Sequence, residues 1–188
     1  MLTTALATIV MGFSGPPPIY CPATLEKIEG KPALTVDYGG ILFETCCAGC
    51  GNPVMQKPGQ LLADAIKARK TVGQFEYDPV TGLKIDLTKA TIYSDYRSVR
   101  YFFTSDDEKK TFDASPSKFV SDVKSEAYFC PVTKTATDEK SAGSYADYKG
   151  TRYFFCCGDC RKAFKENPDK FAANAADAVK PLYSIALK

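Results

Sequence analysis

The chain has 188 residues, and 24 basic against 22 acidic side chains leave a net charge of +2, too small to indicate a nucleic-acid partner. With 45% hydrophobic and 24% charged residues, the composition predicts a folded chain. There are eight Cys and no His. The lack of His excludes Ser-His-Asp and Cys-His catalysis and His-ligated metal sites, so any metal chemistry must use thiolates, carboxylates or backbone groups.

The first 18 residues differ in composition from the rest of the chain. Residues 1–13 are mostly apolar, and Ser14-Gly15-Pro16-Pro17-Pro18 follows. This segment is similar to the apolar part of a signal peptide, although it has no basic residues and is too short to span a bilayer. A packed N-terminal helix or strand is the alternative. We expect an exported bacterial protein, with a cytoplasmic one as the alternative, and no membrane span in the mature chain.

The cysteines form two sets with nearly the same spacing. The first reads C-x24-C-C-x2-C and the second C-x25-C-C-x2-C. Their members are Cys21, Cys46, Cys47 and Cys50, and Cys130, Cys156, Cys157 and Cys160. Two copies of one irregular spacing indicate an internal repeat.

A third copy without cysteines lies between these two. Shifting the last copy back by 52 positions aligns it without a gap, so that Tyr101-Phe102-Phe103 stands opposite Tyr153-Phe154-Phe155. We therefore predict four segments. They are an N-terminal extension (1–18), a Cys-rich unit (19–72), a degenerate unit (73–126), and a Cys-rich unit with a C-terminal helix and tail (127–188).

Each unit predicts a β-hairpin followed by helices. It opens with an aromatic residue and Cys-Pro or Asp-Pro, a turn in which Pro restricts φ. In the last unit a turn at Lys149-Gly150 leads into the strand 151–155, and the C-C-x2-C segment then begins a helix. Pro168 begins a second helix, and residues 61–68 and 171–179 are predicted helical. The fold class is α+β, with three tandem small units that each carry a knuckle of the treble-clef or zinc-ribbon type.

One cysteine before each hairpin and three after it bring four sulfurs together. A helix N-terminus favours thiolate, which suits a metal site. We expect zinc if four sulfurs bind or copper(I) if two or three do, with about two ions per chain. The metal would also stabilise a unit that has little core of its own. Disulfides and redox thiols are the alternatives, although the adjacent Cys46-Cys47 and Cys156-Cys157 disfavour disulfides.

The middle unit replaces the thiols with oxygen-bearing side chains. Its four corresponding positions hold Asp78, Thr104, Ser105 and Glu108. We expect a unit retained for packing; an oxygen site for a hard ion, built from Asp78, Asp106, Asp107 and Glu108, is the alternative.

Two further sets of residues favour simple structural roles. The Tyr-Phe-Phe runs at 101–103 and 153–155 are expected to be core strands. The basic residues are expected to lie on solvated helix faces, and those of the last unit could also shield an anionic site; these residues are Lys109, Lys110, Arg161, Lys162 and Lys165.

The last unit also carries a family resemblance. Cys130-Pro131, then Y-x-G-x2-Y-F-F-C-C-x2-C-x3-F from Tyr148, then Asn167-Pro168-x2-Phe171, resembles the YHS domain and the related TRASH metal-binding domain. The segment 20–62 is similar, and the middle unit resembles the last in all but the ligands. The His of the family name is absent, and Asp37-Tyr38 and Asp147-Tyr148 stand near its place.

The resemblance implies a set of ligands and a function. The TRASH pattern maps onto Cys21, Cys46 and Cys50 and onto Cys130, Cys156 and Cys160, which leaves Cys47 and Cys157 as candidate fourth ligands. It implies heavy-metal sensing, trafficking or resistance, often beside copper-transport domains. We therefore predict a non-enzymatic metal-binding protein in metal storage, delivery or sensing, whose partners are the ion and a metal-transport or other protein. An interaction module with structural zinc and a thiol-disulfide redox protein are the alternatives.

Overall fold

The computed structural model describes residues 16–138 and 140–182, so most of the predicted N-terminal extension lies outside the described residues. The first part of the chain forms a hairpin and a helical layer. Their elements are β1 (Leu34–Tyr38), β2 (Ile41–Thr45), the 3-10 helix η1 (Ala48–Cys50), α1 (Gly51–Gln56) and α2 (Pro58–Ala68). The helix predicted over 61–68 is confirmed as the larger part of α2, and Pro58 begins this helix because its missing N–H is not needed there.

The middle part repeats this order with one added strand. Its elements are β3 (Gly73–Phe75), β4 (Tyr93–Tyr96), β5 (Val99–Phe102), α3 (Asp106–Ala114) and the 3-10 helix η2 (Pro116–Lys118). Ser105 caps α3 by accepting a hydrogen bond from the Glu108 N–H, and three acidic residues occupy the first turn. A capped and acidic start stabilises the helix N-terminus without a metal ion.

The last part contains the predicted hairpin and helices. Its elements are β6 (Ser125–Ala127), β7 (Phe129–Cys130), β8 (Thr135–Ala136), β9 (Ser144–Tyr148), β10 (Thr151–Phe155), α4 (Gly158–Glu166), α5 (Pro168–Ala172), the 3-10 helix η3 (Ala173–Ala178) and β11 (Lys180–Pro181). The strand 151–155 and the helix start at Pro168 are confirmed. The helix expected over 171–179 is interrupted, since α5 ends at Ala172 and the chain continues as a 3-10 helix.

Three two-residue hairpins have the same turn. The residues Gly39-Gly40, Arg97-Ser98 and Lys149-Gly150 all have positive φ, the backbone that matches the twist of the flanking strands. In the second and third hairpins a short strand runs parallel to the outgoing strand with the same register, Gly73 opposite Val99 and Ser125 opposite Thr151. Gly73 and Ser125 are 52 positions apart in the chain, and so are their partners Val99 and Thr151.

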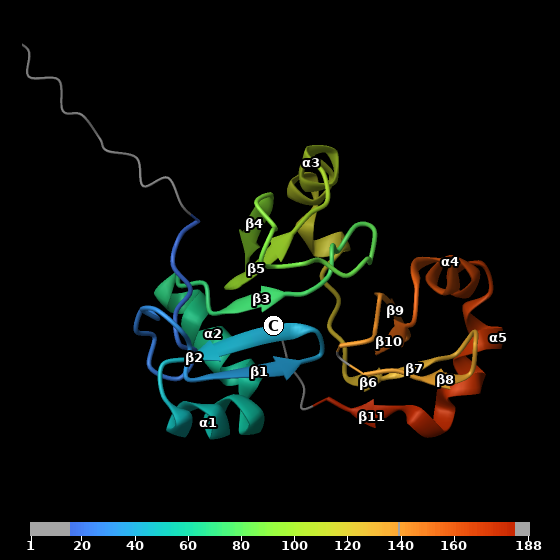
Figure 1. The fold of residues 1–188 in the computed structure, drawn as a ribbon, viewed down its shortest axis with the longest axis horizontal. Helices are drawn as coiled ribbons and strands as arrows, with labels where there is room; N and C mark the ends of the chain where they lie inside the picture. Colours follow the sequence, from blue (N-terminus) through green and yellow to red (C-terminus); the bar gives the residue numbers. More distant parts are fainter. Residues whose placement is uncertain (1–15, 139, 183–188) are drawn as a thin grey trace, which may run out of the picture.

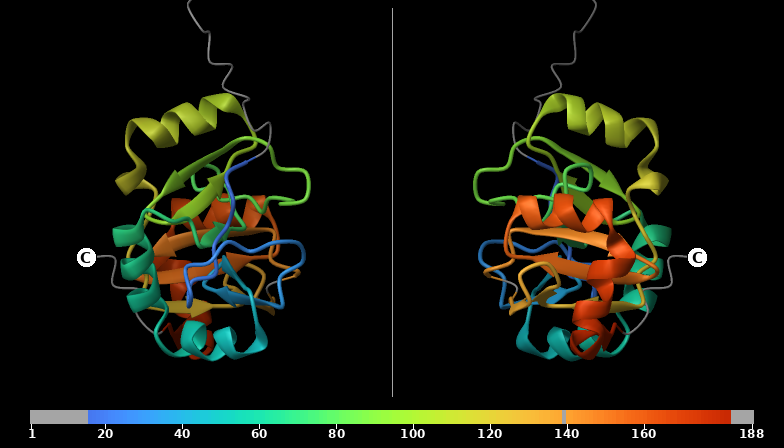
Figure 2. Two further views of the ribbon diagram at one scale, coloured as in Figure 1. Left: turned by 90° about the vertical axis from the view of Figure 1, so that its left-hand side faces the viewer. Right: turned by 90° about the vertical axis from the view of Figure 1, so that its right-hand side faces the viewer.

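The predicted units do not lie in separate sheets. The first two hairpins join one five-stranded sheet, in the order β1-β2-β3-β5-β4, and the third lies in a four-stranded sheet, in the order β11-β6-β10-β9. Figure 1 shows these sheets side by side, with α3 above and α1 below the five-stranded sheet and α4 and α5 beside the other. The views in Figure 2 show the helices around the outside of the strands.

One aromatic core connects all three parts of the chain. Phe75 is 2% exposed, and its ring lies 5.6 Å from that of Tyr101 and 5.2 Å from that of Tyr145. The core also includes Leu62 and Phe154. The prediction that the Tyr-Phe-Phe runs are core strands is confirmed, because all six of these residues are buried. The small units therefore share the apolar burial that each would lack alone.

Arg152 links the three parts electrostatically. Its guanidinium binds Asp147 with two hydrogen bonds of 2.8 and 2.9 Å and donates a third to the Gly39 carbonyl. It also lies over the rings of Phe75 and Tyr145. Since Arg152 is only 5% exposed, its charge depends on this bidentate carboxylate.

We predict that Asp147→Asn destabilises the protein by about 3–5 kcal/mol, because it leaves the buried Arg152 without a counter-charge. Urea unfolding would measure the change. Asp169→Asn is the matched control, since Asp169 pairs with Lys149 in solvent and should contribute little. Equal losses in the two variants would contradict a special role for the buried pair.

Candidate metal centres

A knuckle turn of the same geometry precedes each hairpin. The pairs Tyr20 with Lys27, Tyr77 with Lys84, and Phe129 with Ala136 are bridged across it. The residue directly after each bridged aromatic residue accepts a backbone hydrogen bond that closes the turn. The acceptors are the carbonyls of Cys21, Asp78 and Cys130, and the donors are the N–H groups of Leu25, Gly82 and Lys134, all of which have positive φ. The knuckle therefore presents one side chain, at Cys21, Asp78 or Cys130, toward the start of the helix that follows the hairpin.

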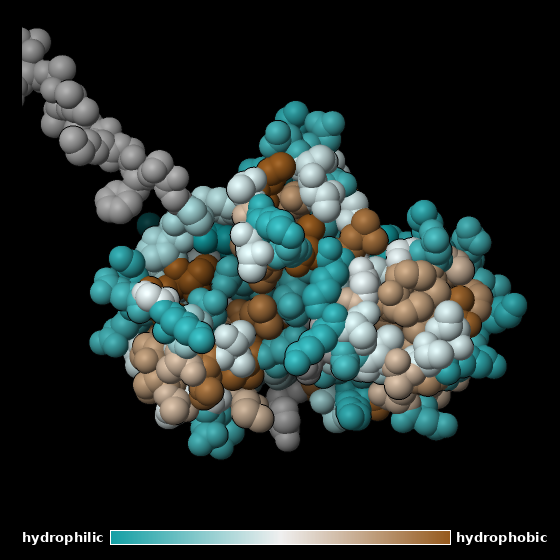
Figure 3. Space-filling model, in the orientation of Figure 1, coloured by the Kyte–Doolittle hydropathy of each residue, from teal (hydrophilic) through white to brown (hydrophobic). Residues whose placement is uncertain are grey.

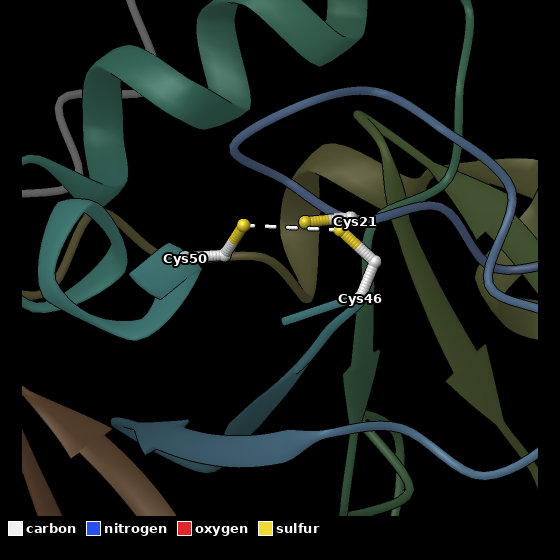
Figure 4. A group of neighbouring side chains, drawn as sticks. All are labelled: Cys21, Cys46 and Cys50. Atoms are coloured by element: carbon white, nitrogen blue, oxygen red, sulfur yellow. Dashed lines mark hydrogen bonds between the residues drawn. The ribbon is translucent and has the colours of Figure 1, made fainter. Parts of the chain in front are cut away.

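Three sulfurs of the first Cys-rich segment converge at this point. The sulfurs of Cys21, Cys46 and Cys50 all lie within 4.8 Å of one another, and those of Cys46 and Cys50 are 3.8 Å apart. Figure 4 shows the three side chains pointing toward one another. Cys21 and Cys50 are buried and Cys46 is exposed, so the cluster opens to solvent on one side.

The second Cys-rich segment repeats this arrangement. The sulfurs of Cys130, Cys156 and Cys160 lie within 4.8 Å of one another, with 3.8 Å between Cys156 and Cys130 and 3.5 Å between Cys156 and Cys160. Again the first and last are buried and the middle one is exposed. All eight cysteines are free thiols in the structure.

The fourth thiol of each set lies beside the cluster. Cys47 and Cys157 are exposed and do not belong to the groups of mutually close sulfurs. Each nevertheless contacts the buried last cysteine, at 2.8 Å from Cys47 to Cys50 and 3.5 Å from Cys157 to Cys160. Each lies just before a helix, as its N-cap residue. The structure thus distinguishes three convergent sulfurs from one peripheral sulfur, where the sequence offers four candidates.

Backbone N–H groups of the knuckle favour thiolate at its cysteine. Burial opposes ionisation of Cys21, but the N–H groups of Cys46, Thr24 and Ala23 outweigh it and lower its pKa to about 7. Burial likewise opposes ionisation of Cys130, and donors from Thr133, Cys156 and Val132 lower its pKa to about 7. A thiol that is half ionised near neutral pH is a ready ligand for a soft metal.

The pKa values of the remaining thiols differ between the buried inner and the exposed outer cysteine of each set. Hydrogen bonding to Cys47 and then burial raise the pKa of Cys50, while burial and then Cys157 raise that of Cys160. The hydrogen bond from Cys50 lowers the pKa of Cys47, and the N–H of Cys160 lowers that of Cys157. In the metal-free protein, the exposed outer thiol of each pair is therefore the more easily ionised.

The sulfur positions fit a thiolate-bound ion. Zinc with Zn–S bonds of about 2.3 Å holds its sulfurs about 3.8 Å apart, and trigonal copper(I) holds them at a similar spacing. The separations of 3.5 and 3.8 Å in the two clusters are close to this spacing. Three thiolates fit a three-coordinate soft ion, and movement of the outer thiol could complete four-coordination.

The middle knuckle fills the same place with a carboxylate. Asp78 is fully buried and accepts hydrogen bonds from the N–H groups of Val80, Thr81 and Thr104. These donors correspond, 52 positions earlier, to the three that surround the Cys130 sulfur. The Thr104 hydroxyl in turn donates to Glu108. Side chains thus complete a hydrogen-bonded network at the position where the other segments place sulfurs.

The structure does not assemble the oxygen site considered for the middle unit. Asp106 and Asp107 are exposed on the first turn of α3, and within the described residues the grouping of close ligand atoms includes only the two cysteine clusters. The carboxylates of α3 pair instead with its own lysines, as Asp107 does with Lys110. This favours the packing interpretation of the middle segment.

The expectation of solvated basic side chains holds for Lys162, which pairs with Asp159 in solvent, but is wrong for Arg161. Arg161 is half-buried, and its guanidinium donates to the Tyr145 carbonyl at 2.7 Å and reaches the Val80 carbonyl at 3.5 Å. It crosses Gly82 so closely that a side chain there would collide with it. Helical position alone could not reveal this, because the contact depends on the packing of α4 against the middle knuckle.

Two knuckle threonines also lie beside the clusters, although they were not among the expected site residues. The Thr24 hydroxyl lies 3.6 Å from the Cys46 sulfur, and the Thr133 hydroxyl lies 3.9 Å from that of Cys156. The signal was present, because a Thr stands three residues after the first ligand of all three segments, at 24, 81 and 133.

A comparison with protein families gave one match. The family model of the YHS domain matches residues 130–175, which supports a YHS-type domain in this part of the chain. No curated protein and no solved structure gave a match. The match spans both the knuckle cysteine and the C-C-x2-C segment of the second cluster. Within the described part of the chain, no helix has the length and apolar character needed to cross a membrane.

In reduced, metal-free protein, we predict that iodoacetamide modifies Cys47 and Cys157 well before Cys50 and Cys160. The outer thiols are exposed and have lowered pKa values, so their rates should reach half of their maximum below pH 9, whereas the inner thiols should need a higher pH. Fragment-ion mass spectrometry of briefly treated samples would locate the label. Cys47→Ser should remove the fast site of the first segment, and equal rates at inner and outer thiols would contradict the assignment.

Proposed function

We propose that the protein is a non-enzymatic metal-binding protein that carries two thiolate sites for zinc or copper(I) and acts in metal storage, delivery or sensing. The observation that carries the proposal is the presence of two separate three-sulfur clusters with metal-compatible spacing. The YHS-type domain supports it for the second cluster. No catalytic residue is proposed, and the ligands are Cys21, Cys46, Cys50, Cys130, Cys156 and Cys160, with Cys47 and Cys157 as outer thiols.

The outer thiols favour an exchangeable ion. A closed structural zinc site holds four ligands away from solvent. Here two ligands of each cluster are buried, the third is exposed, and a fourth thiol lies next to the cluster on the surface. An incoming partner could replace the outer thiol without unfolding the knuckle, which suits delivery to a metal-transport or other protein.

We expect protein purified without added metal to carry two ions per chain, by native mass spectrometry and elemental analysis. Cys130→Ser should leave one ion, because it removes the buried thiolate that the knuckle stabilises. Cys157→Ser is the matched control on the same cluster. It should retain two ions and release one of them faster to a chelator.

The outcomes that contradict the metal proposal are clear. Two ions in Cys130→Ser would exclude this thiol as a ligand. Unchanged stoichiometry and release rate in Cys157→Ser would remove the outer thiol from the site. If no metal is present and the mass is two hydrogens lower per oxidised pair, the sites are not metal centres as purified.

A redox function is a second candidate, because one observation favours it. Cys47 and Cys50 form a C-x2-C pair in contact at 2.8 Å, with an exposed outer thiol of lowered pKa and a buried inner thiol. Thiol-disulfide enzymes use this polarity. Disulfide formation without metal loss would support it.

If instead zinc is bound and chelation melts the fold, a structural zinc site in an interaction module becomes the better account.

We also propose that the chain consists of three tandem copies of one YHS/TRASH-like unit, over 19–72, 73–126 and 127–188, with a degenerate middle copy. Shared turn geometry, shared register and the matching donors around Asp78 and Cys130 support this. The middle copy would then be a metal site in which a hydrogen-bonded network replaces the ion.

Tandem copies predict that the middle unit can be converted into a third metal site. The triple variant Asp78→Cys, Thr104→Cys and Glu108→Cys restores the spacing of the second cluster and should bind three ions per chain. The control Asp78→Cys, Thr104→Cys and Asp107→Cys places the last sulfur one helical position away, so it should bind two. Native mass spectrometry with circular dichroism would decide; a folded triple variant with two ions would contradict the proposal.

A further inference from the structure

A cleft separates the middle part of the chain from the YHS-type domain. It is open to solvent, has a volume of about 370 Å³ and lies between the middle knuckle, the segment after η2, β9 and α4. The segment that leads from η2 to β6 and the strand β9 both contribute lining residues to this cleft. A cleft of this volume at the junction of two structural units is of the size that holds small molecules.

Its charged side chains are mostly basic. Lys118, Arg161 and Lys165 line the cleft, and no ion pair connects any of them to an acid within residues 16–138 and 140–182. The carboxylate in the wall, Asp147, is already bound by Arg152. The cleft therefore has a net positive lining although the chain as a whole is nearly neutral, and the nearby charges of Asp78 and Asp147 offset only part of that of Arg161.

Two of these cations repel each other. Burial and the charge of Arg161 both lower the pKa of Lys165, so an anion between them would remove an unfavourable interaction. Arg161 is held in place by the Tyr145 and Val80 carbonyls and cannot move away without losing both contacts. A fixed guanidinium beside a flexible ammonium group is suited to a carboxylate or phosphate.

The remaining walls are largely apolar. Pro79, Phe119, Tyr148 and Pro168 contribute side chains, and Phe119 and Tyr148 are half-buried, so part of each ring stays accessible. The volume also exceeds what a simple inorganic ion fills. We propose that this cleft binds a small organic anion, whose carboxylate or phosphate lies among Lys118, Arg161 and Lys165 and whose apolar body contacts the aromatic walls. This inference is independent of the metal function.

Isothermal titration calorimetry on the full, metal-loaded chain tests it, with phenyl phosphate and benzoate as probes and inorganic phosphate as the comparison. We expect saturable binding of one aromatic anion per chain, at least tenfold tighter than that of inorganic phosphate; the stronger aromatic probe identifies phosphate or carboxylate as the preferred group. Lys118→Gln with Lys165→Gln should weaken binding at least tenfold. Both side chains contact solvent, so the fold should tolerate the change.

Lys162→Gln is the matched control, because Lys162 lies on the same helix but points into solvent and pairs with Asp159. It should bind the probe like the parent protein. No binding beyond that of sodium chloride at equal ionic strength, equal affinity for inorganic phosphate, or an equal loss in Lys162→Gln would each overturn the proposal. Metal content measured on the same samples separates this result from the fate of the metal sites.

Discussion

The structure depends on a cradle of backbone N–H groups that surrounds one buried acidic side chain in each knuckle. Three successive places in the chain use it, for the thiol of Cys21, the carboxyl group of Asp78 and the thiol of Cys130. The N–H groups lower the pKa of the two cysteines to about 7, whereas burial outweighs them at Asp78 and raises its pKa. Successive N–H groups in a turn form a concave site for an anion. Because one donor comes from the far end of the hairpin, at Cys46, Thr104 or Cys156, the buried side chain also ties the knuckle to the start of the helix.

This constraint accounts for the difference between the segments. In the two Cys-rich segments, ionised sulfurs would bring like charges together, and a bound metal ion would neutralise them. A carboxylate can instead be satisfied by N–H donors and by the Thr104 and Glu108 side chains. The middle segment therefore completes its knuckle with hydrogen bonds alone, and it supplies strands and aromatic rings that pack against both Cys-rich segments.

Arg152 connects the three parts of the chain. It is buried against the shared aromatic core, it satisfies Asp147 of its own hairpin, and it donates to the turn of the first hairpin. Arg100 repeats the pairing with Asp95 but donates to the Pro17 carbonyl near the N-terminus. The same Arg–Asp pair thus occurs in the second and third hairpins, but its arginine contacts a different neighbouring segment in each.

The sequence by itself determined the hairpin turns, the start of the helices and the spacing of the two cysteine sets. These follow from spacing along the chain: a 52-residue shift relates turn, strand and helix start of the second and third hairpins, and the two cysteine sets have nearly the same spacing. The tertiary structure decided which three of four thiols converge, that the first two hairpins join one sheet, and that Arg161 turns inward to border a basic cleft. These depend on contacts between residues far apart in the sequence, and short-range spacing carries no record of how separate hairpins pack against one another.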